Sequence, residues 1–285
     1  MKLVRIAVTF ILSFLLMMLL IVNELSFVTS STLLNSNFYS TPLTQASYYD
    51  HLGTEIEKGF INVGLASGFP KEVFVNSIDR SWLKLQGNAY IASVIDYLSL
   101  KTDTIRYEFN SKPLEAKLNQ KIVSYAKQMG SPITQEDLTS TNALLLKGVQ
   151  QRVMIVDPQN SIFVSLRHFT GLLVRGKIYL VFTGLLILLC LFLVNLKEPY
   201  KFIHWLAYSF ISAGLFILIP SSLLLISSVL NRLAVHDLYL RQAVGAILER
   251  FVSYTLYMGL ATLIIGILLV FASYIRKSPS SNNPS

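Results

Sequence analysis

Four long stretches of the chain contain no Asp, Glu, Lys or Arg, and each is rich in Leu, Ile, Phe and Val. They comprise residues 6–23, 178–196, 202–231 and 251–275. A helix needs about 20 residues to cross the hydrocarbon core of a bilayer, and all four stretches approach or exceed that length. None of them alternates apolar and polar residues with period two, and lipid offers unpaired peptide groups no partner. The pattern therefore predicts four transmembrane helices.

The first stretch begins as both a signal anchor and a signal peptide do, because Lys2 and Arg5 precede an apolar run. A signal peptide has an apolar core of about 7–15 residues followed by a small-residue cleavage site. Here the apolar run extends to Val22, and residues 24–27 offer no clean site. We expect an uncleaved anchor, with a cleaved signal peptide as the open alternative. Both alternatives export the segment that follows.

Between the first two stretches lies an insert whose apolar residues recur mainly at helical spacing. Its Ser/Thr/Asn-rich start, residues 29–44, is expected to be a linker. Helices are predicted over residues 48–63, 70–78, 81–98, 114–125 and 134–153. Pro70 suits a first helical turn, Ser81 suits an N-cap, and Thr134 with Asp137 resembles a capping box. The insert is therefore expected to be an all-helical bundle.

These patterns together predict an all-α membrane protein with an extracytoplasmic helical bundle inserted between the first and second of its four transmembrane helices. The expected parts are a signal-anchor helix, an exported domain and a three-helix membrane domain with a short cytoplasmic tail, over residues 1–24, 25–176 and 177–285. The insert is long enough to bury a core of its own.

Composition and charge agree with this division. Hydrophobic residues make up 53% of the chain and charged residues 14%, whereas soluble domains carry about a quarter charged residues. Residues 24–174 hold 13 basic and 13 acidic side chains, and the remainder holds 11 and 3. The whole net charge of +8 therefore lies beside the apolar stretches. Such placement is typical of membrane flanks, and we expect no nucleic-acid partner.

Basic residues near the ends of spans indicate the cytoplasmic side. With an even number of spans, one side collects Lys2, Arg5, Lys197, Lys201, Arg276 and Lys277. The opposing side collects Arg175, Lys177, Arg232, Arg241 and Arg250, so the bias is one of density. We expect a multi-pass plasma-membrane protein with both termini in the cytoplasm and residues 25–176 outside.

Candidate chemistry is sparse. The third stretch carries Pro220, Ser221 and Ser222, which mark either a kink with local hydrogen bonds or a helix break that forms a substrate site. His168, His236 and Asp237 are expected together at the outer surface as a polar cluster, although their spacing matches no metal-ligand motif. Cys190 is the only cysteine, so no intramolecular disulfide forms. We expect no cofactor, no metal and no enzymatic activity.

An amphipathic segment precedes the fourth span. Residues 238–250 combine apolar and charged side chains, and they are expected to extend the fourth helix out of the bilayer. Together with residues 162–173, which lead into the second span, they could form a continuous platform under the insert. Helices that pass unbroken from the exported domain into the membrane would transmit motion or hold the domain rigidly in place.

The run Gly68-Phe69-Pro70-Lys71-Glu72-Val73-Phe74, with Ile78, Trp82, Tyr90-Ile91 and Ile95-Asp96-Tyr97-Leu98, resembles a fragment shared by uncharacterised four-span membrane proteins of Gram-positive bacteria. The resemblance covers about a quarter of the chain, all of it in the insert. It implies a bacterial plasma-membrane protein with an exported helical domain, and it carries no activity and no site residues.

The leading hypothesis is a non-enzymatic accessory or regulatory subunit whose exported domain binds a partner or an envelope ligand. Its partners would be the lipid bilayer and another membrane or envelope protein, or a second copy of the chain. The alternative is an oligomeric channel or small-solute permeation protein. Its pore would be lined by Ser209, Ser212, Ser221 and Ser222. A weaker third reading is an envelope enzyme that uses His168 or His236.

Overall fold

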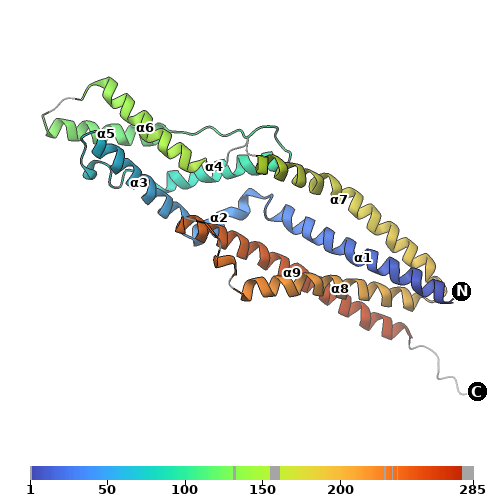
Figure 1. The fold of residues 1–285 in the computed structure, drawn as a ribbon. Coiled ribbons are helices and arrows are strands. Elements are labelled where there is room, and N and C mark those ends of the chain that lie inside the picture. Colours follow the sequence, from blue (N-terminus) through green and yellow to red (C-terminus); the bar gives the residue numbers. More distant parts are fainter. Residues whose placement is uncertain are drawn as a thin grey trace, which may run out of the picture. The chain divides into compact units, whose positions relative to one another are not determined.

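The computed structural model describes residues 2–130, 133–154, 161–227, 229–232, 234–235 and 237–277, and every regular element in those ranges is helical (Figure 1). Four helices are long and apolar enough to cross a membrane, as the sequence predicts. They are α1 (Lys2–Ser31), α7 (Ser161–Val194), α8 (Pro199–Ile226) and α9 (Leu238–Lys277). The protein is therefore a multi-pass membrane protein.

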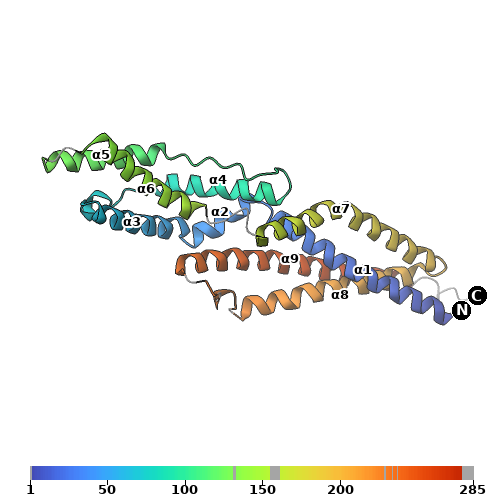
Figure 2. The ribbon, with the colours of Figure 1, turned by 45° about the horizontal axis from the view of Figure 1, so that its top comes forward.

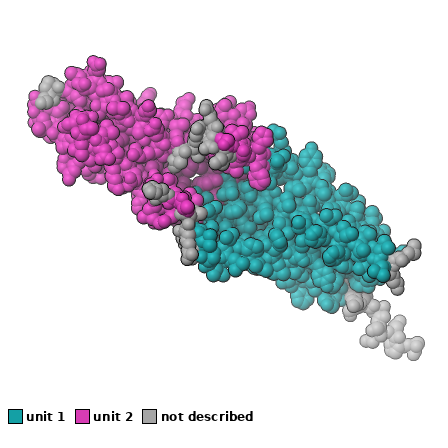
Figure 3. Space-filling view, viewed as in Figure 1, with its two compact units in different colours: residues 1–33, 170–233, 247–285 teal, residues 34–169, 234–246 magenta. Residues whose placement is uncertain are grey.

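The chain forms two compact units, which Figure 3 distinguishes by colour. Unit 1 contains residues 1–33, 170–233 and 247–285, and unit 2 contains residues 34–169 and 234–246. The division runs through α7 and α9, whose first turns belong to unit 2 and whose remaining turns belong to unit 1.

In unit 1, α1 lies between α7 and the pair formed by α8 and α9 (Figures 1 and 2). Packing is tight between α1 and α8, where Ala213 and Ile217 of α8 contact Ile21 of α1. On the other side of α1, Leu19 lies directly against Gly184 of α7. The short 3-10 helix η2 (Val229–Arg232) follows α8.

Unit 2 is built from α2 (Ser36–Gln45), α3 (Tyr48–Ala66), η1 (Lys71–Val73), α4 (Arg80–Leu98), α5 (Lys112–Gln128) and α6 (Gln135–Val153). Helix α3 contacts α2, α4, α6 and η1, so its apolar side forms the centre of the core. The most deeply buried core side chains are Leu52, Ile56, Phe74, Leu83, Leu118, Ile122, Leu145 and Val149.

Several predicted elements of the insert are confirmed. Helix α5 covers the predicted 114–125 segment, and α6 begins after Thr134, whose hydroxyl accepts a hydrogen bond from the Asp137 N–H at 3.1 Å. The predicted extension of the fourth membrane helix over residues 238–250 is also confirmed, because α9 is continuous from Leu238.

Two predictions for the insert are wrong. The segment predicted as a linker, residues 29–44, contains the end of α1 and most of α2. The helix predicted from Pro70 is only the single turn η1, because the chain turns at Asn76, which has a φ of 55°. The apolar residues that suggested a helix, Val73, Phe74 and Ile78, are nevertheless buried in the core.

The cap of α4 is Asp79 rather than the predicted Ser81. One Asp79 oxygen accepts hydrogen bonds from the Ser81 N–H at 2.8 Å, from the Trp82 N–H at 3.4 Å and from the Ser81 hydroxyl. These hydrogen bonds, the Ser81 hydroxyl first, lower the pKa of Asp79 below its ordinary value.

Replacing Asp79 by alanine is expected to lower the free energy of unfolding by about 1 kcal/mol, because α4 loses its N-terminal cap. Thermal unfolding of the detergent-solubilised chain measures this loss. Since the pKa is lower in the folded state, the contribution is present above about pH 4 and fades as the pH falls below that. Asp79→Asn should retain most of the stability, and an equal loss in both variants would contradict the capping role.

Candidate functional site

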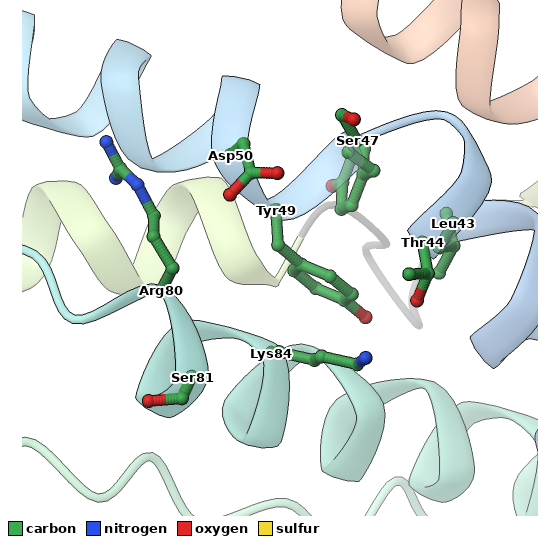
Figure 4. A pocket seen from close by; sticks show the side chains of 9 residues that line it. Leu43, Thr44, Ser47, Tyr49, Asp50, Arg80, Ser81 and Lys84 are labelled. Atoms are coloured by element: carbon green, nitrogen blue, oxygen red, sulfur yellow. The ribbon is translucent and has the colours of Figure 1, made fainter.

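A small hollow opens in unit 2 between the α2–α3 turn and the first turns of α4 (Figure 4). Its volume is about 220 Å³. The turn that shapes it contains Ser47, which adopts a left-handed backbone with φ of 47°. The lining side chains are Leu43, Thr44, Ser47, Tyr48, Tyr49, Asp50, Arg80, Ser81 and Lys84.

The hollow combines the Lys84 ammonium group with neutral hydroxyl groups and with the charged side chains of Asp50 and Arg80. Arg80 is already paired with Glu57 at 3.5 Å. Lys84, one turn further along α4, is half-buried and has no side-chain partner within the described part of the chain. Its side chain extends along the hollow in the direction of Thr44 (Figure 4).

The aromatic wall of the hollow stays neutral. Burial raises the pKa of Tyr49, whose hydroxyl donates a hydrogen bond to Asn88 Oδ1 at 2.8 Å. Burial also raises the pKa of Tyr48. The Lys84 ammonium group can pair with a carboxylate, such as an acidic side chain of a bound protein.

Within unit 2, Arg167 fastens the first turns of α7 to the end of α4 and to the segment that follows α4. Its guanidinium lies 4.1 Å from the centre of the Tyr97 ring at the end of α4, and this ring stacks on Phe163 with an interplanar angle of 3°. Arg167 Nη2 also donates to the Thr102 carbonyl at 3.1 Å and to Asp103 Oδ1 at 3.3 Å. A cation–π contact and two charge-assisted hydrogen bonds thus converge on one side chain.

The first turn of α9 also packs against a helix of unit 2, through a contact between two tyrosine rings. The ring of Tyr239 lies 5.9 Å from the ring of Tyr48 in α3, within unit 2. The first turns of α7 and α9 therefore carry side chains that pack against α4 and α3, respectively.

The interior of unit 1 contains an acidic residue that the sequence did not place in a membrane helix. The first span was predicted to end at Asn23, whereas α1 continues past Glu24 to Ser31. Glu24 is 9% exposed, and its Oε1 accepts a hydrogen bond from Thr262 of α9 at 2.6 Å. Its other carboxylate oxygen is buried without a hydrogen-bond partner among the described residues. The resumption of apolar residues after Glu24 is the signal that would have placed it inside the helix.

Two serines join α1 to α8 at the centre of unit 1. The hydroxyls of Ser13 and Ser209 lie 2.8 Å apart, and Ser209 also donates to the Ser13 carbonyl at 2.9 Å. Both side chains are buried. These hydrogen bonds fix the register of the two helices.

The residues singled out from the sequence lie apart from these contacts. His168 is exposed on α7 beside Arg167, Asp237 is exposed just before α9, and His236 lies outside the described residues. Within the described ranges, His168 and Asp237 form no ion pair, and no three His, Cys, Asp or Glu residues gather as metal ligands do.

The proline of α8 does not interrupt the helix. Pro220 lies inside α8, which continues to Ile226, and the proline itself is exposed. Ser221 is buried and Ser222 is half-buried. The described backbone therefore has a continuous helix at the position where a break was considered.

Comparisons with protein-family models, with curated proteins and with solved structures found no match. The resemblance of residues 68–98 to bacterial four-span proteins therefore stays a prediction.

Proposed function

We propose that this chain is a non-enzymatic accessory or regulatory subunit of a bacterial membrane complex. In this proposal the helices of unit 2 lie outside the cytoplasm and bind a partner or envelope ligand, and α7 and α9 relay the bound state into the membrane. The hollow beside Lys84 is the part of unit 2 that we propose contacts an acidic group of the partner.

The continuity of α7 and α9 carries this proposal. At about 1.5 Å per residue, their 34 and 40 residues extend about 51 and 60 Å. The hydrocarbon core of a bilayer is only about 30 Å thick, so several turns of each helix must lie outside it. Those outer turns carry Arg167 and Tyr239, which pack on the insert. A displacement of the insert would therefore act directly on two spans.

Helix α7 also offers a surface to a partner in the membrane. Only 6% of its most apolar stretch is buried, against 22–28% for the other three spans. Its side chains Tyr179, Phe182 and Leu186 are 60–72% exposed. A span with so little packing of its own is free to contact another membrane helix.

The density of basic residues supports the proposed orientation. One side of the spans collects the basic residues Lys2, Arg5, Lys197 and Lys201. This side is expected to be cytoplasmic.

The channel alternative is less well supported. Of the four serines proposed to line a pore, Ser209 is 1% exposed and is hydrogen-bonded to Ser13 within the same chain. Its hydroxyl is therefore used in packing α1 against α8.

Site-specific photo-crosslinking in native membranes tests the proposal. A benzophenone amino acid at Phe182 of α7 is expected to crosslink the chain to a second membrane protein. The matched position is Phe216 of α8, which is equally apolar and 62% exposed, against 65% for Phe182. We expect at least fivefold less crosslinking there. Equal crosslinking at both positions would contradict the proposal, and adducts between copies of the chain alone would favour the oligomeric alternative.

A further inference from the structure

Unit 1 contains a second hollow, which none of the interactions proposed above uses. It is formed by the start of α1, the start of α8 and the end of α9, and its volume is about 500 Å³. Its lining side chains are Ile6, Tyr200, Lys201, His204, Trp205, Ser273 and Tyr274. We propose that this headgroup hollow binds the phosphate-bearing headgroup of an anionic phospholipid.

The position of the headgroup hollow along the helices selects a lipid as its occupant. It lies where the spans begin and end, at the depth at which Trp and Tyr mark the boundary between hydrocarbon and headgroups. Tyr274 is 62% exposed and is followed by Ile275, which is 77% exposed. Ile6 on α1 is exposed as well. Acyl chains can therefore lie along these apolar side chains while the headgroup occupies the hollow.

The charge around the headgroup hollow selects an anion. The Glu198 carboxylate is shared by two cations, with Arg5 Nη1 at 2.8 Å and Lys201 Nζ at 2.9 Å. One negative charge therefore faces two positive charges, and of these three side chains Lys201 lines the hollow. A phosphate diester supplies one negative charge and several acceptor oxygens, so it complements this arrangement.

His204 adds a directed donor or acceptor. Its Nδ1 lies 3.4 Å from the Ser273 hydroxyl, which itself donates to the Val270 carbonyl at 2.7 Å. Because that hydroxyl proton is already used, Ser273 Oγ is available to accept a hydrogen bond from Nδ1–H of the imidazole. In this tautomer Nε2 of the neutral imidazole is an acceptor, so it suits a hydroxyl group of the headgroup rather than the phosphate oxygens.

Lipid-dependent thermal unfolding of the detergent-purified chain tests the inference. The probes are dioleoyl phosphatidylglycerol, dioleoyl phosphatidylcholine and inorganic phosphate. We expect saturable stabilisation by phosphatidylglycerol, and at least fivefold weaker apparent affinity for phosphatidylcholine, because its choline carries a compensating positive charge. Inorganic phosphate should give no shift at the same concentrations, since it lacks acyl chains.

Two variants locate the effect. Lys201→Gln should weaken the apparent affinity for phosphatidylglycerol at least fivefold, and Lys201→Arg should restore it. The matched control is Lys197→Gln, which removes an exposed charge just before α8 and outside the hollow, and which should stay within twofold of the wild type. Equal stabilisation by both lipids, stabilisation by phosphate alone, or equal losses in the Lys197 and Lys201 variants would overturn the inference. These outcomes are independent of the photo-crosslinking of α7.

Discussion

Replacing Gly214 by leucine is expected to abolish the folded, monodisperse form of the detergent-purified chain. A Cβ atom at Gly214 of α8 would lie 2.7 Å from the Leu263 nitrogen and 2.9 Å from the Gly259 oxygen of α9. Both are backbone atoms, so they cannot move aside as the end of a flexible side chain does. The whole helix must shift, and Gly214→Ala alone is expected to cost about 1–3 kcal/mol. Size-exclusion chromatography after heating to increasing temperatures measures how much of the monodisperse form each variant loses.

Gly214 belongs to a contact in which the backbones of α8 and α9 meet directly. Added Cβ atoms at Gly259 and Gly266 would lie 3.0 and 2.7 Å from the α8 nitrogens of Leu218 and Ile211. Lipid is as apolar as the side chains, so close packing of this kind, rather than hydrophobic burial, holds membrane helices together. A larger residue at Gly214 therefore removes the main source of affinity between these helices.

Gly176 provides the matched control. It lies inside α7, and a Cβ atom there would have no neighbour within 4 Å. Gly176→Leu is expected to leave the chromatographic profile and the unfolding temperature close to those of the wild type. If Gly176→Leu and Gly214→Leu cause equal losses, the direct α8–α9 contact does not explain the effect.

The membrane helices could be predicted from the sequence because one property, the absence of charge over about 20 residues, defines them. Their ends could not, since the rule stops at the first charged residue. The first predicted span therefore ended just before Glu24. Helix α1 nevertheless continues to Ser31 and buries this carboxylate against Thr262. The two residues are 238 positions apart in sequence, and no local pattern relates them.

In the insert, helices with a clear periodicity and a local cap were predictable. Helix α6, with Thr134 as its cap, is such a case. The segment after Pro70 shows the limit of periodicity, because buried residues at helical spacing also occur in an irregular segment. There the Ile78 N–H donates to Glu57 of α3 at 3.1 Å, a contact that replaces helical hydrogen bonding.

The candidate site was only partly predictable. The amphipathic segment before the fourth span and the apolar residues that lead into the second indicated continuous helices, and α7 and α9 have that continuity. The residue that fastens α7 was not predicted. His168 was the predicted polar residue of this segment, whereas its neighbour Arg167 makes the contacts. A basic residue at the start of a long apolar helix reads as a membrane flank, and only the fold places it over Tyr97.

Replacing Arg167 by methionine is expected to release the first turns of α7 from the end of α4 and from the segment that follows α4. The variant loses a cation–π contact and two hydrogen bonds of a charged group, together worth about 2–4 kcal/mol. Hydrogen exchange of residues 161–170 in the full chain should accelerate by about 30-fold or more, since each 1.4 kcal/mol corresponds to about tenfold. Arg167→Lys keeps the charge but not the planar guanidinium, so it should recover only part of the protection.

The same variant separates anchoring from partner binding in the proposed relay. The α7 surface around Phe182 is unchanged in Arg167→Met, so crosslinking from Phe182 to a membrane partner should persist. What should disappear is any change of that crosslinking when the insert binds its ligand, because the insert no longer acts on α7.

Arg175→Met is the matched control, since Arg175 is exposed on the same helix and has no side-chain partner among the described residues. If exchange of residues 161–170 accelerates equally in both variants, Arg167 is not the anchor. If exchange accelerates only in Arg167→Met while the crosslinking still responds to ligand, α7 is fastened by Arg167 but is not the relay.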